Sequence, residues 1–127
     1  MTRYQYYLAP MEGITNATFR RTYHAHFKSM DKYFTPFLCP HTKRDLTTKE
    51  KKEILPENNE GMYVVPQILT NQAEGFLETA GKLEQYGYRE INLNLGCPSK
   101  TVITKGRGSG FLAFPAELRE FLDEIFF

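Results

Sequence analysis

The segment Ile91-Asn-Leu-Asn-Leu-Gly-Cys-Pro-Ser-Lys100 indicates a short strand that ends in a glycine turn and presents Cys97 at its tip. Side chains alternate between the two faces of a strand, so Asn92 and Asn94 share one face while the intervening leucines share the other. A buried amide costs free energy unless it is hydrogen-bonded. We therefore expect a polar partner on the face that carries the amides, and a bound ligand is the natural candidate.

Strand-like segments recur along the whole chain. Four are predicted, at residues 4–8, 32–37, 62–68 and 89–95. Their ends are separated by roughly 30 residues, which is the size of one βαβ unit. Residues 40–59 are polar and charged, and they are predicted to form a long loop with one helical turn at 48–52. Alternating strands and helices imply a parallel α/β sheet, either doubly wound or closed as a barrel.

Helix signals separate these strands. The first predicted helix follows Thr15 or Asn16 as its N-cap, and the second follows Asn71. Gly87 is expected to stop the second helix, and a last helix is predicted to start at Pro115. The residues expected on the apolar faces of the three helices are Phe19, Tyr23 and Phe27 in the first, Ala73, Phe76, Leu77, Ala80 and Leu83 in the second, and Leu118, Phe121, Leu122 and Ile125 in the last.

Composition narrows the class of protein. The chain has 127 residues, with 16 basic and 15 acidic side chains. That length suits one domain, and the near-neutral balance argues against a strongly basic nucleic-acid module. The sequence has no run of about 18 apolar residues, so no membrane span is predicted. Two cysteines, Cys39 and Cys97, are too few for a disulfide framework, and this favours a location in the cytoplasm. A metal site is not predicted, because the sequence has no second pair of soft ligands at a suitable spacing.

Candidate site residues follow the predicted strands, where parallel α/β folds place their sites. They are Pro10, Met11 and Glu12 after the first strand, Gln67 at the end of the third, and Asn94 with Cys97 at the end of the fourth. Taken singly, Met11 could be a core residue of a turn, Gln67 a structural amide and Cys97 an inert thiol. Cys39 is interpreted as an inert buried thiol.

A small positive cluster follows the proposed thiol. It consists of Lys100, Lys105 and Arg107 in a glycine-rich segment. RNA phosphates would suit these charges, and a solvated loop that serves solubility is the alternative.

Three motifs resemble those of the tRNA-dihydrouridine synthases. The first is Ala9-Pro-Met-Glu-Gly-Ile-Thr-Asn-Ala-Thr-Phe-Arg20, and the second is Val65-Pro-Gln67. The third is Asn92-Leu-Asn-Leu-Gly-Cys-Pro-Ser-Lys100 followed by Lys105-Gly-Arg-Gly-Ser-Gly110, which is similar to that family's active-site signature. The motifs occur in the family's order, and the third is the specific one.

The resemblance implies an FMN-bearing (β/α)₈ TIM barrel that reduces uridine in tRNA to dihydrouridine, with NADPH as reductant. By that likeness Pro10, Met11 and Glu12 would border the flavin, and Gln67 would hydrogen-bond the edge of its ring. Asn94 would face the flavin or the target base, and Cys97 would be the proton donor.

The residue types suit this chemistry. Reducing the C5–C6 bond of uracil requires a hydride at one carbon and a proton at the other. Reduced flavin supplies the hydride. A thiol can supply the proton, because an ordinary cysteine has a pKa of about 8.5 and is mostly protonated near neutral pH. The glycines around Cys97 would let its loop move over the substrate.

The resemblance covers only part of such a barrel. It implies that residues 1–127 are the first four βα units, a truncated half-barrel without the C-terminal half and the helical RNA-binding domain. We expect such a fragment to self-associate through its exposed edges. Two alternatives stay open at this stage: an FMN-barrel oxidoreductase that acts on a free pyrimidine, and a non-catalytic RNA-binding remnant.

Overall fold

The strands pair in parallel and form two small sheets. The computed structural model describes residues 2–126. Strand β1 (Tyr7–Leu8) pairs with β2 (Lys32–Phe34), and β2 pairs with β3 (Val64–Val65). Strand β4 (Gln67–Ile68) pairs with β5 (Asn92–Leu93). The predicted mixed α/β fold with parallel strands is confirmed, although each strand is shorter than predicted.

Pro66 divides the predicted third strand into β3 and β4. Proline has no N–H to donate to the ladder, so the regular pairing with β2 stops there. Just beyond it, the N–H of Gln67 donates to the hydroxyl oxygen of Thr35 at 3.1 Å instead of to a carbonyl. Thr35 is fully buried. At this interruption the hydroxyl of the buried Thr35 therefore takes the place of a backbone acceptor for Gln67, the first residue of β4.

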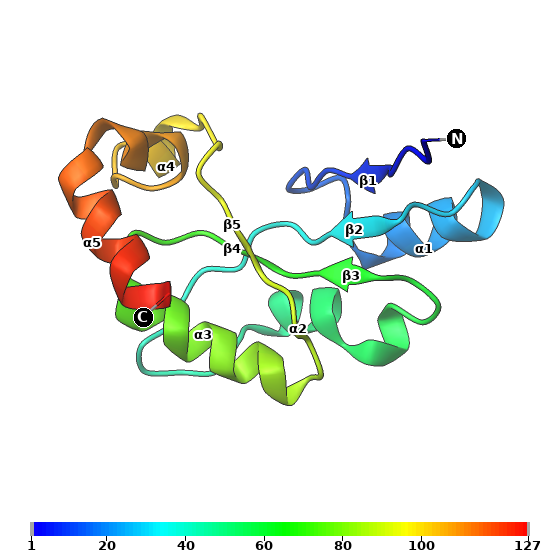
Figure 1. The fold of residues 1–127 in the computed structure, drawn as a ribbon. Coiled ribbons are helices and arrows are strands. Elements are labelled where there is room, and N and C mark those ends of the chain that lie inside the picture. Colours follow the sequence, from blue (N-terminus) through cyan, green and yellow to red (C-terminus); the bar gives the residue numbers. More distant parts are fainter. Residues whose placement is uncertain (1, 127) are drawn as a thin grey trace.

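The helices occupy the connections. They are α1 (Ala17–His26), α2 (Thr48–Ile54), α3 (Ala73–Gln85), α4 (Lys100–Ile103) and α5 (Pro115–Phe126), with 3-10 helices η1 (Pro56–Asn58) and η2 (Gly108–Ala113). In Figure 1 the strands β1, β2 and β3 run from right to left, and α4 and α5 lie beyond their carboxyl ends. None of the helices within residues 2–126 is long and apolar enough to cross a membrane.

Capping residues set most helix boundaries as predicted. The side chain of Asn16 accepts from the N–H of Phe19 and starts α1, and Gly87, with a φ of 95°, follows α3. The region predicted as a loop contains a fuller helix, α2, because Thr47 and Glu50 form a capping box. Burial alone would raise the pKa of Glu50, but hydrogen bonds from Thr47, His41 and Cys39 hold it below the ordinary value.

Two helix predictions are wrong. Helix α3 begins at Ala73 after Gln72, and Asn71 does not cap it. Of the three aromatic residues expected on the apolar face of α1, Phe19 and Phe27 are exposed, at 39% and 65%, and Tyr23 is half-buried. The helix buries Ala17 and Arg20 instead. Apolar spacing alone therefore identified the helix but not the side that faces the protein.

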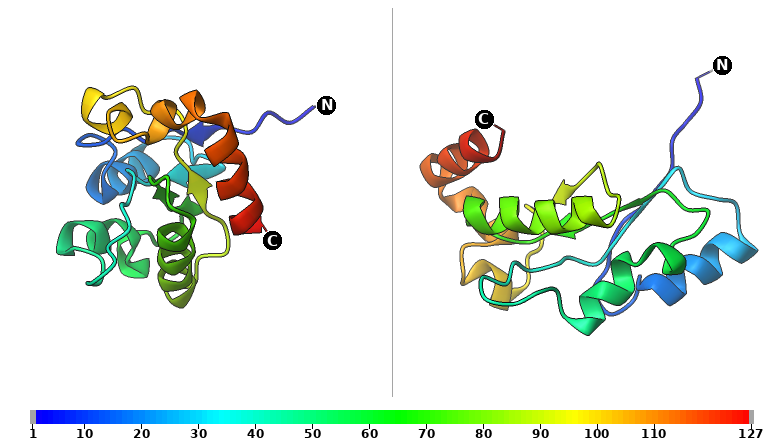
Figure 2. Two further views of the ribbon diagram at one scale, coloured as in Figure 1. Left: turned by 90° about the vertical axis from the view of Figure 1, so that its left-hand side faces the viewer. Right: turned by 90° about the horizontal axis from the view of Figure 1, so that it is seen from below.

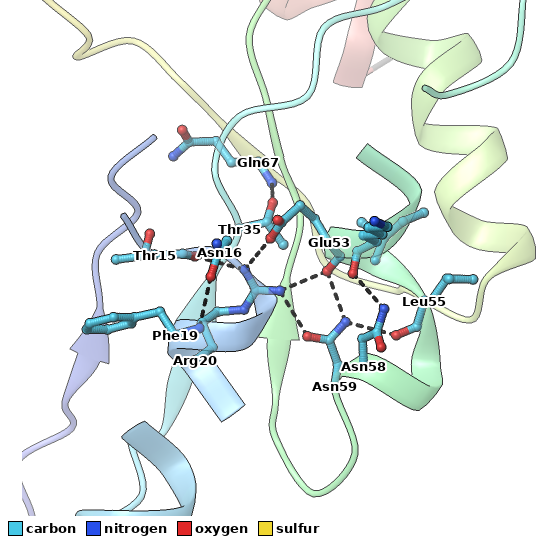
Figure 3. Close-up of polar contacts among 12 residues, drawn as sticks. Thr15, Asn16, Phe19, Arg20, Thr35, Glu53, Leu55, Asn58, Asn59 and Gln67 are labelled. Atoms are coloured by element: carbon cyan, nitrogen blue, oxygen red, sulfur yellow. Dashed lines mark hydrogen bonds and ion pairs between the residues drawn. The ribbon is translucent and has the colours of Figure 1, made fainter. Parts of the chain in front are cut away.

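A buried guanidinium explains which face of α1 turns inward (Figure 3). Arg20 is fully buried and donates to the carboxylate of Glu53 at 2.7 Å. It also donates to the carbonyl oxygens of Thr15 and Glu53 and to the side-chain oxygen of Asn59. These partners lie before α1, at the end of α2 and after η1, so one side chain ties three segments together.

Two apolar clusters hold the remaining elements. The first contains Leu38, Leu46, Ile54, Ile68 and Leu83. The second contains Ala73, Phe111 and Phe121, and it joins α3, η2 and α5. Phe121 lies edge-on to Phe111 and to Phe76, with ring centroids 5.3 Å and 5.9 Å apart, so α5 packs on α3 (Figure 2). Consequently the glycine-rich segment before α5 is fastened to the core.

Replacing Arg20 by methionine is expected to destabilise the protein by about 3–5 kcal/mol, because it leaves the buried carboxylate of Glu53 without its cation. Urea unfolding of the purified variant measures the change. Arg21→Met is the matched control. This neighbouring arginine is exposed, and its substitution is expected to change the unfolding free energy by no more than about 0.5 kcal/mol. Equal losses in the two variants would contradict a special role for the buried pair.

Candidate active site

One cavity of about 720 Å³ opens at the carboxyl ends of the strands. Its wall includes every residue predicted for catalysis or cofactor binding, namely Pro10, Met11, Glu12, Gln67, Asn94 and Cys97. Pro36 and Phe37 after β2, and Thr101 and Val102 of α4, complete part of the wall. The three basic residues Lys100, Lys105 and Arg107 lie outside it. The structure thus brings together side chains from three separate motifs.

Three amides form a chain along one face of the cavity. Gln67 donates from Nε2 to Asn92 Oδ1 at 2.7 Å, and Asn94 donates from Nδ2 to Gln67 Oε1 at 2.9 Å. The register explains the meeting, because Gln67 is the β-partner of Asn92 on the neighbouring strand. The expected polar partner of the two asparagines is therefore, in the first instance, a glutamine of the same protein.

Two backbone N–H groups determine how the three hydrogen-bonded amides are oriented. The N–H groups of Gly96 and Cys97 both donate to the side-chain oxygen of Asn94, at 3.1 Å and 3.0 Å. A backbone N–H can only donate, so this end of Asn94 must be its oxygen and the other end its NH₂. The same logic then orients Gln67. Each end of the Gln67 amide is used once, which leaves one N–H and one lone pair for a further partner.

Cys97 is held on both sides of its α-carbon. Its N–H donates to Asn94, as above, and its carbonyl oxygen accepts from the N–H of Ser109 at 3.1 Å and from the Ser109 hydroxyl at 3.0 Å. The thiol is free of any disulfide and half-buried. The backbone of Cys97 is therefore fixed, and its side chain reaches the cavity from a defined position.

The glycine-rich segment after Cys97 is more ordered than the predicted mobile loop. It forms α4 and η2, and Asn71 donates from Nδ2 to the carbonyl oxygen of Lys105 at 3.0 Å. Gly108 has a φ of 56°, and a Cβ atom there would lie 2.7 Å from the Cys97 carbonyl oxygen. Glycine at this position therefore allows close packing.

The basic residues differ in their surroundings. Lys100 and Lys105 are exposed, whereas Arg107 is partly buried and its Nε has no hydrogen-bond partner among the described residues. Burial raises the pKa of the Cys39 thiol, and Arg107 and Lys105 are near enough to oppose that shift. Cys39 lines a neighbouring cavity of about 650 Å³, away from Gln67. No group of metal-ligating side chains within residues 2–126 could hold an ion.

Some residues that build the site were not identified from the sequence. Asn92 shares the predicted amide face with Asn94, but its role as the partner of Gln67 follows only from the strand register. Ser109 and Asn71 contact backbone carbonyls distant in sequence, and such contacts leave no pattern in spacing. Thr35, by contrast, belongs to the segment Thr35-Pro36-Phe37 at the end of the predicted second strand, where parallel folds place their sites, but its contact with the Gln67 N–H is visible only in the structure.

Known proteins with similar sequences point to one family. A family model described as dihydrouridine synthase matches residues 7–125. A probable tRNA-dihydrouridine synthase of Staphylococcus aureus (strain COL) is 32% identical over 111 residues, which cover 85% of this chain and 33% of that protein. The tRNA-dihydrouridine synthase B of Pasteurella multocida (strain Pm70) is 29% identical over 119 residues, covering 94% of this chain and 35% of that protein. The chain spans about a third of the length of these curated relatives, and it belongs to the dihydrouridine synthase family.

Proposed function

We propose that this chain carries the FMN-binding and proton-donating part of an enzyme that reduces uridine in tRNA to 5,6-dihydrouridine, with NADPH as reductant. The observation that supports this most directly is the convergence of Met11, Gln67, Asn94 and Cys97 on one cavity. Both curated relatives carry tRNA-dihydrouridine synthase in their names. In this proposal the chain supplies the first four βα units of a (β/α)₈ barrel.

The cavity suits a flavin in size and chemistry. Its volume of about 720 Å³ falls in the range of small-molecule sites. Pro10 and Met11 offer an apolar wall, and Glu12 borders the same loop. Gln67 keeps one donor and one acceptor position, which matches the edge of a planar heterocycle. These residues, together with Asn94, would hold FMN, and the bound cofactor would supply a hydride to the pyrimidine.

Cys97 would provide the proton that completes the reduction. Hydride addition at one carbon of the C5–C6 bond leaves the other carbon to be protonated, so an acid must stand near that atom. Cys97 lines the cavity that also contains Gln67, and its fixed backbone gives the thiol a constant starting position. Cys39 lines the other cavity and is not proposed to take part.

The RNA would lie over the segment that follows Cys97. Lys100 and Lys105 are exposed beside α4, where phosphates could reach them, and Arg107 would contribute from its partly buried position. The target base must leave its stack to reach a flavin in this cavity. A polyanionic substrate explains the positive charges better than a free pyrimidine does.

Replacing Cys97 by alanine is expected to lower dihydrouridine formation in tRNA by about 100-fold or more, because a positioned general acid contributes at least that factor. The assay measures dihydrouridine produced by the full-length protein with NADPH. Cys39→Ala is the matched control and should keep the parent activity. Unchanged activity in Cys97→Ala would remove the thiol from its proposed role. Equal turnover of free uridine and tRNA by the parent would favour the free-pyrimidine alternative.

Replacing both Lys100 and Lys105 by alanine is expected to weaken tRNA binding and to reduce its salt dependence. Each lost phosphate contact should lower the slope of log K against log salt by roughly one unit. Filter binding at several salt concentrations measures that slope. Lys28→Ala removes an exposed lysine before β2, at the opposite end of the strands, and should leave the slope unchanged. A slope that does not respond to the double substitution would contradict RNA contact at α4.

A further inference from the structure

We propose that Ser109 is a positioning residue for the Cys97 thiol, acting through the Cys97 carbonyl. The proposal rests on the proposed function only for its effect on turnover, since the contact itself is independent of any reaction. It assigns a purpose to the glycine-rich segment that follows the thiol: this segment holds the donor of the proton in place rather than opening and closing over the substrate.

The geometry of the contact carries this inference. Ser109 donates twice to one oxygen, from its N–H at 3.1 Å and from its hydroxyl at 3.0 Å. A carbonyl oxygen has two lone pairs, so both are occupied. On the other side of the same residue, Asn94 accepts from the Cys97 N–H. With both backbone groups held, the position of the Cβ atom is set, and the thiol keeps only its own side-chain rotation.

Gly108 allows Ser109 to come close enough to Cys97 to form both hydrogen bonds. A Cβ atom at position 108 would lie 2.7 Å from the Cys97 carbonyl oxygen, 3.1 Å from its Cβ and 2.8 Å from a methyl group of Val102. The residue also adopts a φ of 56°, which side-chain-bearing residues rarely tolerate. The backbone before Ser109 can therefore approach Cys97 only because residue 108 is glycine.

The segment that carries Ser109 is itself anchored. Phe111, two residues on, is buried against Ala73 and Phe121 in the second apolar cluster. Gly110 packs so closely on Ile103 that a Cβ atom there would lie 2.8 Å from the Ile103 backbone. Asn71 fastens Lys105 from the side of α3. Ser109 thus connects the thiol to the packed core through a short and rigid path.

Ser109→Ala tests the hydroxyl contact in the full-length protein. A hydrogen bond of this kind corresponds to a factor of about 2–10, so we expect kcat to fall by that factor while KM for tRNA stays constant. Ser109→Thr, which keeps the hydroxyl, should restore turnover. Thr104→Val removes another hydroxyl that donates to a carbonyl in the same segment, that of Lys100, and should have no effect.

A second readout does not depend on catalysis. The rate of iodoacetamide alkylation of Cys97, measured by peptide mass spectrometry, should change by about 2- to 10-fold in Ser109→Ala, while the rate at Cys39 stays constant as an internal reference. Gly108→Ala should change both kcat and the Cys97 rate more strongly, because its methyl group displaces the Cys97 carbonyl.

The outcomes separate this proposal from the proposed function. Unchanged kcat and an unchanged Cys97 alkylation rate in Ser109→Ala would overturn the positioning role. A changed alkylation rate in a protein that forms no dihydrouridine would support the contact while the proposed function fails. A fall in kcat that Ser109→Thr does not restore, or that Thr104→Val reproduces, would also count against Ser109 as the positioning residue.

Discussion

A fully buried guanidinium is the constraint on which the first half of this structure depends. A charge removed from water must be paired and hydrogen-bonded, and both terminal nitrogens of Arg20 donate, to four acceptors from three segments, while its Nε has no partner among the described residues. Its demand for partners decides which face of α1 points inward, even though Phe19 of that helix and Phe27 just after it then remain exposed. Through the Thr15 carbonyl, the same side chain supports the loop that carries Met11, whose N–H donates to the Thr15 hydroxyl at 2.8 Å.

The cavity at the strand ends contains a different polar arrangement, because three neutral amides form one of its faces. Gln67 of β4, Asn92 of β5 and Asn94 just after β5 hydrogen-bond one another, so the buried Gln67 amide has a partner at each end before any ligand binds. Two backbone N–H groups at the glycine turn determine which end of each amide points where. The result is a wall whose donors and acceptors are oriented before anything binds, as expected for a preorganised site.

Residues with local signals were predictable from the sequence, and residues with only long-range partners were not. Asn16, Gly87 and Pro115 mark helix ends through their own backbone preferences, and the structure places all three as expected. The strand ends in turn brought the six candidate residues to one cavity. Asn71 failed as a predicted cap because its side chain contacts Lys105, 34 residues away. The regular structure of the glycine-rich segment could not be predicted from the sequence either, because it depends on the tertiary contact of Phe111 with Phe121.

The strand order has a consequence for how the chain can fold. Within each of the two sheets, every strand pairs with its neighbour along the chain, and Leu38 outside the named strands bridges to Ile68 of β4. Every pairing therefore closes a loop of similar, moderate length, and no early segment must wait for a distant one to appear. A chain built in this way can add one unit after another as it emerges from the ribosome, each new strand meeting a surface that already exists.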